Sequence, residues 1–310
     1  MKYRPFGATG LRVSEVGFGA WQLGNPIWGA QDADPRALID EALAQGCTFF
    51  DTAPGYSSGA SEAALGEGLR EVRDRVVICT KFGHTPEGES DFSASAVQPS
   101  LEASLRRLRT DRVDVYLLHN PPRELLEGRE AAVFDELERL KGEGRIGVYG
   151  VSLDSRAELQ LMLRNTRCGA AEVLFNAFHQ EPAGAFEEAA ARGVGLIAKV
   201  PLDSGWLSGK YGKASRFEGI RDRWAPEVVA RRGDLVEKLR ALLPVGVELS
   251  EAALGFVLAA PQISTVIPGA KSVPQLKRNL AVSGRPLPED TVRAVREFWE
   301  RELRGAPLPW

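Results

Sequence analysis

The sequence predicts an α/β fold in which eight parallel strands close into a (β/α)₈ TIM barrel. Short apolar runs alternate with segments that carry helical periodicity. The runs are nearly continuously apolar, as expected of strands that are covered on both faces. No composition break or linker divides the 310 residues, and eight strand–helix units in about 250–300 residues are typical of this barrel. We therefore predict a single domain over residues 1–310.

The chain begins with an expected β-hairpin. Two short strands, residues 3–6 and 11–16, flank a Gly-Ala-Thr-Gly turn, and the hairpin is expected to cover the amino-terminal mouth of the barrel. The first barrel strand is the glycine-rich segment 17–21. It lacks the third glycine and the directly following helix of a dinucleotide-binding turn. The alternative fold, an open doubly wound sheet, would be expected to carry that turn.

The remaining elements alternate along the chain. The other expected strands are residues 47–51, 76–81, 113–119, 146–152, 172–176, 194–200 and 263–267. The expected helices are residues 35–45, 61–70, 97–109, 130–141, a helix from 155, 183–192, 226–243, 250–260, 272–282 and 289–303. Asp34 followed by Pro35 predicts a helix start, and Ser155 with Glu158 has the spacing of a capping box. The last segments are extra C-terminal helices.

Composition excludes several classes of function. The net charge of −3 and the absence of a basic block argue against a nucleic-acid or membrane-surface partner. The sequence shows neither an apolar stretch of transmembrane length nor an N-terminal signal pattern, so we expect a cytoplasmic protein. Its three cysteines and three histidines lack CxxC, HxxxH or HExxH spacing. We therefore expect no metal site.

Ionisable side chains stand at the carboxyl ends of three neighbouring predicted strands. Asp51 ends the second strand, Tyr56 lies in the loop after it, Lys81 ends the third strand and His119 ends the fourth. Barrel sites lie at this end, and neighbouring strands are roughly 4.8 Å apart, so we expect the four side chains to meet. Each also has a structural explanation by itself, as a turn cap, loop packing, a solvated amine or a strand terminator.

Together these groups suit transfer of a proton to a carbonyl oxygen whose carbon accepts a hydride. The reference pKa of a phenol is about 10. A buried Lys81 ammonium is expected to lower the pKa of Tyr56, and a shift of about 2 units requires about 3 kcal/mol, which one close charge pair supplies. Asp51 is the expected counter-charge of Lys81. His119 is expected to donate a hydrogen bond to the substrate oxygen.

Hydride chemistry needs a cofactor, and the segment after the last strand offers a phosphate site. Residues 267–280 form a turn, with Gly269, that leads into a helix, and a helix N-terminus attracts phosphate. Barrels often hold phosphate in the loops after strands 7 and 8. Lys271 is a candidate phosphate partner, and Gln275 and Asn279 share a helix face that could meet an adenine. The alternative is a solvated basic helix start.

The order of these motifs resembles the aldo-keto reductase family over nearly the whole chain. The segments that carry the resemblance are FDTAPGY (50–56), SEAALGEGL (61–69), VVICTKFG (76–83), VDVYLLHNPP (113–122), GVSLDS (150–155), PLDSGWLSGKY (201–211) and STVIPGAKSVPQLKRNL (264–280). Their ordered spacing is specific, whereas any single segment would be weak evidence. The resemblance implies the barrel and an NAD(P)H-dependent oxidoreductase that reduces an aldehyde or ketone, or catalyses the reverse reaction.

The resemblance also implies roles for individual residues. Tyr56 is then the general acid, and Lys81 and Asp51 tune it. The implied cofactor contacts are Ser152 with the nicotinamide carboxamide, the loop Pro201, Leu202, Asp203 and Ser204 with Lys210 around the pyrophosphate, and Lys271 with the 2′-phosphate, which favours NADPH over NADH.

Four cofactor positions depart from the family's pattern. Leu153 stands where asparagine is frequent, and Arg278 replaces a common acidic residue near the adenine. Glu172 stands where a carboxamide-binding glutamine is usual, and Lys199 where an aromatic ring often stacks on the nicotinamide. No contact between Glu172 and Lys199 is predicted. These departures affect the strength and selectivity of cofactor binding rather than the acid–base groups.

The expected substrate is a small carbonyl compound or a sugar. Trp21 is expected to contact it, together with Tyr56 and His119. Further candidates for an apolar pocket wall are Trp28, Phe82, His84 and Trp206. Three alternatives stay open: a sugar dehydrogenase working in the oxidative direction, a cofactor-binding regulatory or redox-sensing subunit with negligible turnover, and a barrel isomerase without nicotinamide. The oligomeric state does not follow from the sequence.

Overall fold

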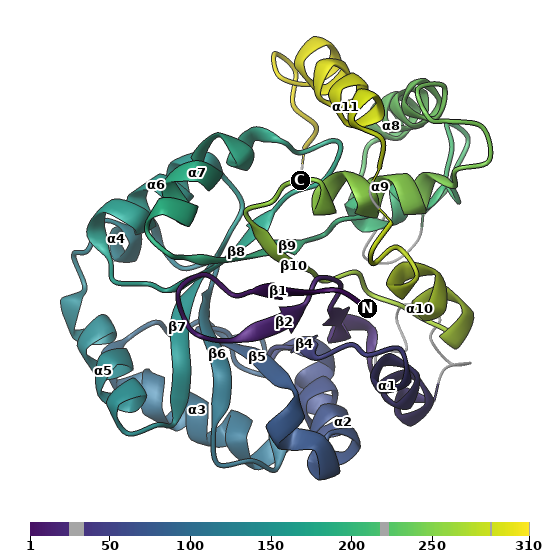
Figure 1. Cartoon of the computed structure of the whole chain (residues 1–310). Coiled ribbons are helices and arrows are strands. Elements are labelled where there is room, and N and C mark those ends of the chain that lie inside the picture. Colours follow the sequence, from purple (N-terminus) through teal and green to yellow (C-terminus); the bar gives the residue numbers. More distant parts are fainter. Residues whose placement is uncertain (25–33, 218–222, 286, 310) are drawn as a thin grey trace.

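The computed structural model describes residues 1–24, 34–217, 223–285 and 287–309. Its central feature is a sheet of eight parallel strands, each hydrogen-bonded to the next in chain order. The strands are β3 (Phe18–Gly19), β4 (Phe49–Asp51), β5 (Val77–Phe82), β6 (Val113–His119), β7 (Ile146–Leu153), β8 (Ala170–Leu174), β9 (Gly195–Lys199) and β10 (Ile263–Val266). Figure 1 shows these strands at the centre with the helices around them. The predicted fold class is confirmed.

Two isolated parallel bridges join the two ends of this sheet. They pair Val16 with Val266 and Gly19 with Gly269. The backbones approach so closely that a Cβ atom at Gly19 would lie 2.6 Å from the carbonyl oxygen of Ile267. Only glycine leaves room for such an approach. Closure of the barrel therefore depends on the glycine-rich character of the first strand.

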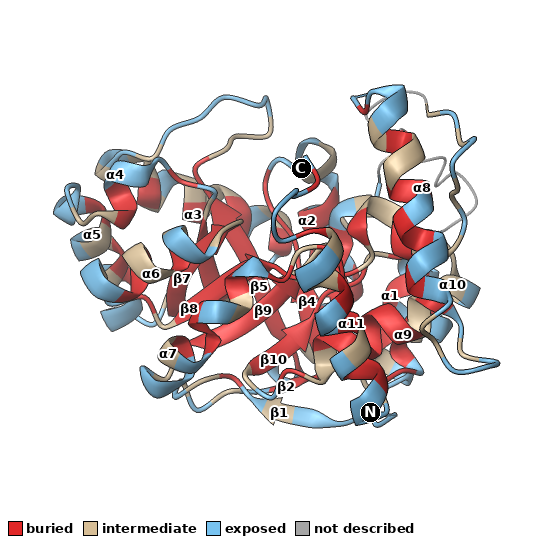
Figure 2. Cartoon of the chain, turned by 90° about the horizontal axis from the view of Figure 1, so that it is seen from above, coloured by how far each residue is buried: buried red, intermediate tan, exposed pale blue. Residues whose placement is uncertain are grey.

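Helices follow the strands and cover the outer face of the barrel. They are α1 (Pro35–Ala44), α2 (Ala60–Gly68), α3 (Ala94–Leu108), α4 (Arg123–Leu126), α5 (Ala131–Gly142), α6 (Arg156–Asn165), α7 (Phe186–Ala191), α8 (Pro226–Arg240), α9 (Leu249–Leu258), α10 (Val273–Leu280) and α11 (Glu289–Glu302). Figure 2 shows buried residues on the strands and on the helix faces toward them, with exposed residues outside. In the part of the chain described here, no helix is both long and apolar enough to span a membrane.

Two helix starts follow the predicted capping chemistry. The Asp34 carboxylate accepts the backbone N–H of Arg36 at 2.9 Å at the start of α1. Ser155 and Glu158 form both bonds of a capping box at the start of α6. Each cap satisfies N–H groups that have no partner within the helix, which contributes about 1 kcal/mol.

The N-terminal hairpin closes one end of the barrel, as predicted. Strands β1 (Tyr3–Pro5) and β2 (Arg12–Ser14) pair antiparallel and lie across the strand ends in Figure 1. Phe6 and Val13 are fully buried in the core cluster inside the barrel, and the ring centroid of Phe6 lies 5.9 Å from that of Phe49. Burying a phenylalanine contributes about 1.5–3 kcal/mol, so the hairpin is part of the core.

Some local predictions are wrong. The first strand ends at Gly19, and Ala20–Gln22 forms a 3₁₀ helix instead. A second 3₁₀ helix, Tyr56–Gly59, precedes α2, and a third, Glu181–Ala185, takes part of the helix predicted before β9. The short helix α4 was not predicted. Apolar periodicity does not show where the backbone leaves a regular hydrogen-bond ladder, which explains these differences.

Candidate active site

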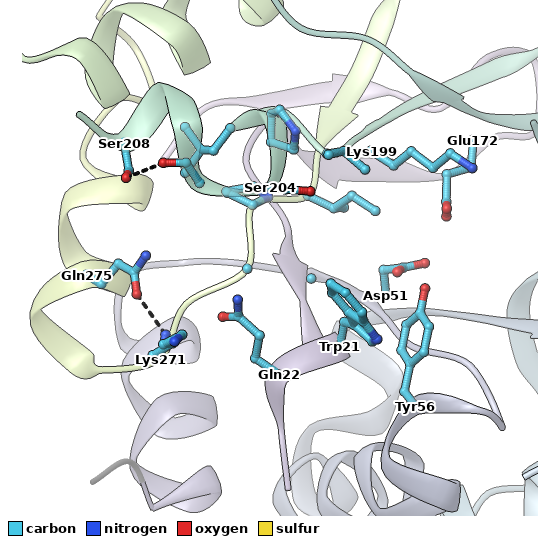
Figure 3. A pocket seen from close by; sticks show the side chains of 18 of the residues that line it. Trp21, Gln22, Asp51, Tyr56, Glu172, Lys199, Ser204, Ser208, Lys271 and Gln275 are labelled. Atoms are coloured by element: carbon cyan, nitrogen blue, oxygen red, sulfur yellow. Dashed lines mark hydrogen bonds between the residues drawn. The ribbon is translucent and has the colours of Figure 1, made fainter. Parts of the chain in front are cut away.

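A cavity of about 720 Å³ lies at the carboxyl ends of the barrel strands. Figure 3 shows its two ends: Asp51 and Tyr56 stand at one, and Lys271 and Gln275 at the other. Trp21 lies beside Tyr56, with the two ring centroids 6.3 Å apart. The cavity thus connects an ionisable cluster with the start of α10.

Lys81 is the centre of the ionisable cluster. Its Nζ donates hydrogen bonds to Asp51 Oδ2 at 2.7 Å, to the Thr52 carbonyl oxygen at 3.1 Å and to Tyr56 Oη at 3.4 Å. The side chain is fully buried. Asp51 pairs in register with Cys79, two residues before Lys81. Because residues two apart point to the same face of a strand, the two charged side chains meet inside the mouth.

His119, at the end of β6, completes this group. Its ring centroid lies 5.9 Å from that of Tyr56, with the planes at 82°, and 5.3 Å from that of His84. Burial and repulsion from Lys81 lower the pKa of His119 to about 3. The ring is therefore neutral at pH 7, with one nitrogen that donates a hydrogen bond and one that accepts.

A second carboxylate shares Lys81 with Asp51. Glu172 Oε2 lies 3.3 Å from Lys81 Nζ. Burial and repulsion from Glu172 outweigh the attraction of Lys81 and raise the pKa of Asp51 to about 8. Burial also opposes ionisation of Glu172, but attraction by Lys81 and Lys199 is stronger and lowers its pKa to about 2. Glu172 is therefore the more readily ionised of the two carboxyl groups beside Lys81.

This charge distribution corrects the expectation for Tyr56. Its pKa was predicted to fall below the ordinary value because of Lys81. Burial instead raises the pKa of Tyr56; Lys81 lowers it, but repulsion from Asp51 and Glu172 opposes that effect. The prediction fails mainly because it left out the burial of the phenol, and also because it counted one carboxylate beside the ammonium where the fold places two.

Ser152 links Glu172 to Lys199. Its hydroxyl donates to Glu172 Oε1 at 3.0 Å and accepts from Lys199 Nζ at 2.9 Å. The Lys199 ammonium also donates to Asn120 Oδ1 at 3.0 Å and lies 2.8 Å from Asp154 Oδ1. Ser152 is fully buried, so its hydroxyl is committed to two charged partners.

The opposite end of the cavity is rich in cations. Among the described residues, the basic side chains that line the cavity are Lys210, Arg223, Lys271 and Arg278, besides Lys199 near the ionisable cluster. The start of α10 is partly satisfied by its own residues, because Gln275 Oε1 accepts the backbone N–H of Lys271 at 2.8 Å and Ser272 caps the helix. The cations therefore provide most of the attraction for an anion here.

A strained loop after β9 forms one wall. Val200, Asp203 and Ser204 have positive φ angles of 54°, 47° and 53°, which disfavour residues with a Cβ atom. The buried Asp203 carboxylate forms an ion pair with the buried Arg232 and lies 3.3 Å from His179 Nε2. Strained backbone of this kind occurs mainly at functional sites.

A sequence model described as the Aldo/keto reductase family matches residues 15–300. The chain belongs to this family.

Similar proteins support this assignment. The chain is 31% identical over 292 residues to an L-galactose dehydrogenase of Arabidopsis thaliana, covering 91% of this chain and 88% of that protein. The holo form of an aldo-keto reductase from Bacillus halodurans has a TM-score of 0.80 and 28% identity, covering 96% of each chain. A glycerol dehydrogenase from Gluconobacter oxydans has a TM-score of 0.78 and 25% identity, covering 99% of this chain and 97% of that one. Aldo-keto reductases are oxidoreductases that use NAD(P)H and act on small carbonyl compounds.

The structure brings most of the sequence-predicted site residues to this cavity. The predicted residues that line it are Trp21, Asp51, Tyr56, His119, Glu172, Lys199, Pro201, Leu202, Ser204, Lys210, Gly269, Lys271 and Gln275. Lys81 and Ser152 lie directly beneath the lining. Asn279 is buried and donates to the Gly269 carbonyl oxygen at 3.1 Å, so it supports the turn.

The predicted apolar wall is only partly present. Phe82 and Trp206 are fully buried and do not line the cavity, and His84 does not line it either, whereas Trp21 does. Trp206 packs instead against Tyr211 and Trp224, each with a ring centroid 5.9 Å away. Trp28 lies outside the described residues. The prediction failed for the buried pair because position in a loop does not distinguish a core anchor from a pocket wall.

Among the lining residues that sequence reasoning missed are Gln22, Asn120, Asp154 and Arg223. Asn120 directly follows the predicted His119, and Asp154 follows the end of β7. The strand-end rule could have identified both. Arg223 has no comparable signal, because it does not directly follow a predicted strand.

The residues present suit a pyridine dinucleotide. The cavity extends from the cations to Tyr56, and Gln22 Oε1, which is buried in its wall, has no hydrogen-bond partner among the described residues. The subsite at Ser152 differs from the family's pattern, because an ionised carboxylate and an ammonium occupy positions where neutral groups are usual.

Proposed function

We propose that this protein catalyses the NADPH-dependent reduction of a small aldehyde, ketone or sugar. The observation that carries the proposal is the 3.4 Å hydrogen bond from Lys81 Nζ to Tyr56 Oη at the mouth of a barrel of this family. It joins a phenol that can donate a proton to an ammonium that stabilises the charge left behind. The neutral His119 ring lies edge-to-face with the phenol, with the ring centroids 5.9 Å apart.

Bound NADPH would supply the hydride that the carbonyl carbon accepts. Tyr56 donates its proton to the carbonyl oxygen, and the C=O bond becomes an alcohol. Lys81 stabilises the phenolate as it forms. His119 donates a hydrogen bond that orients the carbonyl oxygen, and Trp21 covers the substrate side of the site. The positions of Tyr56, His119 and Trp21 at the cavity, and the hydrogen bond from Lys81 to Tyr56, support these proposed roles.

The cofactor assignment rests on the chemistry of the lining. Lys210, Lys271 and Arg278 can pair with phosphates, and the strained loop of Pro201, Leu202 and Ser204 offers a preformed wall for the pyrophosphate. Glu172 and Lys199 meet the nicotinamide end through Ser152, and Gln275 lies near the adenine end beside Gly269. The positive charge at Lys271 favours a 2′-phosphate, and therefore NADPH over NADH.

The test combines cofactor binding with turnover. Quenching of tryptophan fluorescence by NADPH and NADH measures both affinities, and absorbance at the reduced cofactor's band follows reduction of aldehydes, ketones and sugars. We expect Tyr56→Phe to bind NADPH within a few-fold of wild type and to lose turnover by at least about 100-fold. Turnover of Tyr56→Phe within a few-fold of wild type would refute Tyr56 as the proton donor.

A second candidate is a sugar dehydrogenase that works in the oxidative direction. The similarity to the plant L-galactose dehydrogenase favours it. It predicts faster oxidation of aldoses with NAD or NADP than reduction of aromatic aldehydes. A regulatory subunit, by contrast, would bind cofactor tightly and turn over no carbonyl compound, and a nicotinamide-free isomerase would bind none.

We also propose a cytoplasmic protein whose partner is a small molecule rather than nucleic acid or membrane. The support is the net charge of −3 and the lack of a basic block in the sequence.

A further inference from the structure

Glu172 occupies an unusual place in the ionisable cluster. It is buried in β8, and its two carboxylate oxygens contact different cationic systems. Oε2 lies 3.3 Å from Lys81 Nζ. Oε1 accepts from the Ser152 hydroxyl at 3.0 Å, and that hydroxyl in turn accepts from Lys199. A glutamine at this position would have similar size but no charge.

We propose that Glu172 is a positioning residue: its carboxylate pairs with the Lys81 ammonium that also contacts Tyr56, and it thereby favours the protonated, proton-donating phenol over the phenolate. This inference rests on the proposed role of Tyr56 and deepens it. Reduction needs the protonated phenol, whereas oxidation of an alcohol needs a phenolate that accepts the alcohol proton. Glu172 therefore favours reduction over oxidation in the alkaline range where a phenol titrates.

Geometry sets the strength of this effect. Tyr56 Oη and the Glu172 carboxylate each lie within 3.4 Å of Lys81 Nζ, so they are no more than about 7 Å apart. At an effective dielectric constant of about 20, charges at that separation shift a pKa by roughly 1–2 units. Because the phenolate and the carboxylate are both negative, Glu172 opposes ionisation of the phenol.

Other titratable groups belong to the same cluster as Tyr56 and Glu172, and the sign of the effect on the Tyr56 pKa has to hold in their presence. They are Asp51 on β4, Cys79 and Lys81 on β5, His119 on β6, Asp154 after β7 and Lys199 on β9, with His84 beyond His119. The pKa of Asp51 is about 8, so Asp51 is ionised in the alkaline range where a phenol titrates. In that range Glu172 adds a second negative charge. Glu172→Gln removes it whatever the state of Asp51 is at neutral pH.

The first test is the pH profile of carbonyl reduction. In wild type we expect kcat to stay high up to the most alkaline pH at which the protein is folded, or to decline only near that pH. In Glu172→Gln the decline is expected at a pH lower by at least about 1 unit. A purely structural role of Glu172 would lower kcat evenly and leave the profile unshifted. An unshifted profile would therefore overturn the proposal.

The second test needs neither cofactor nor turnover. NMR of protein labelled at the tyrosine Cζ carbon follows ionisation of each phenol, and the Tyr56 signal is assigned by its loss in Tyr56→Phe. Glu172→Gln is expected to bring the Tyr56 transition to lower pH by the same amount. If the Tyr56 signal has the same pH dependence in wild type and Glu172→Gln, up to the highest pH at which both stay folded, the proposal is overturned.

A matched control comes from the outside of the barrel. Glu138 accepts a hydrogen bond from Tyr149 Oη at 2.7 Å, so Glu138→Gln makes the same chemical change beside a different tyrosine. It is expected to affect the Tyr149 signal and leave Tyr56 unchanged. If Tyr56 shifts in Glu172→Gln but no carbonyl compound is reduced, the charge relation stands and the proposed function fails. If reduction occurs and no shift is seen, the proposed function stands and this inference fails.

Discussion

Replacing Lys81 by methionine tests the electrostatic core of the site. The ammonium is fully buried, and both carboxylates beside it are almost completely buried. Methionine keeps the length of the side chain but removes the ammonium that both Asp51 and Glu172 contact, so that Glu172 keeps only the attraction of Lys199. Removing one partner of a buried ion pair costs about 3–5 kcal/mol of the free energy of unfolding. We expect a loss of this size at alkaline pH.

The loss of stability is expected to depend on pH, because Asp51 and Glu172 can lose their negative charges by binding protons. Without Lys81, the pKa of Glu172 rises from about 2 to above its unfolded value. A group whose pKa is raised on folding contributes stability below its unfolded pKa, and this contribution is lost as pH rises through the folded pKa. The deficit of Lys81→Met relative to wild type is therefore expected to grow from pH 5.5 to pH 8.5.

Urea unfolding followed by tryptophan fluorescence, at both pH values, measures this deficit. Lys141→Met is the matched control, because Lys141 is exposed and such surface changes stay within about 0.5 kcal/mol. Adding Asp51→Asn to Lys81→Met is expected to restore part of the loss at pH 8.5. A deficit below about 1 kcal/mol, or one that is equal at both pH values, would refute the reasoning.

Three further predictions concern Phe6 in the N-terminal hairpin, His119 and Lys271. Phe6→Ala removes a fully buried ring and is expected to lower the free energy of unfolding in urea by about 3–5 kcal/mol without changing NADPH affinity. A large loss of affinity would contradict the view that the N-terminal hairpin acts only on stability. Burial holds the pKa of His119 near 3, so the stability that the neutral ring contributes is lost as pH falls from about 6.5 toward 3. His119→Gln is therefore expected to reduce the fall of the free energy of unfolding over this pH range. An unchanged pH dependence would show that other groups cause the fall. Lys271→Ala is expected to weaken NADPH binding by about 10-fold and NADH binding by much less, and equal weakening would argue against a 2′-phosphate contact.

Much of the fold follows from local sequence features. The alternation of apolar runs and helical patterns predicts the barrel because strands covered on both faces must be apolar along their length. Asp34 and Ser155 mark helix starts through chemistry that acts within a few residues. The single-domain organisation of residues 1–310 stays a prediction.

The candidate tetrad also follows from the sequence, for a topological reason. Asp51, Lys81 and His119 end consecutive strands, and parallel strands joined in chain order bring their carboxyl ends to one rim. Tyr56 follows Asp51 closely enough to reach the same place. No long-range pairing has to be known to predict this meeting.

Only the tertiary structure decided which charged side chains contact each other in the site. Glu172 meets Lys81, and Lys199 meets Ser152, through side chains that cross the mouth between strands far apart in the sequence. The pKa of Tyr56 depends on burial and on the sum of the charge interactions that these distances set, and no local sequence pattern encodes either. Residue order therefore determined which groups reach the rim, whereas the closed barrel determined their spacing and so the direction in which each one titrates.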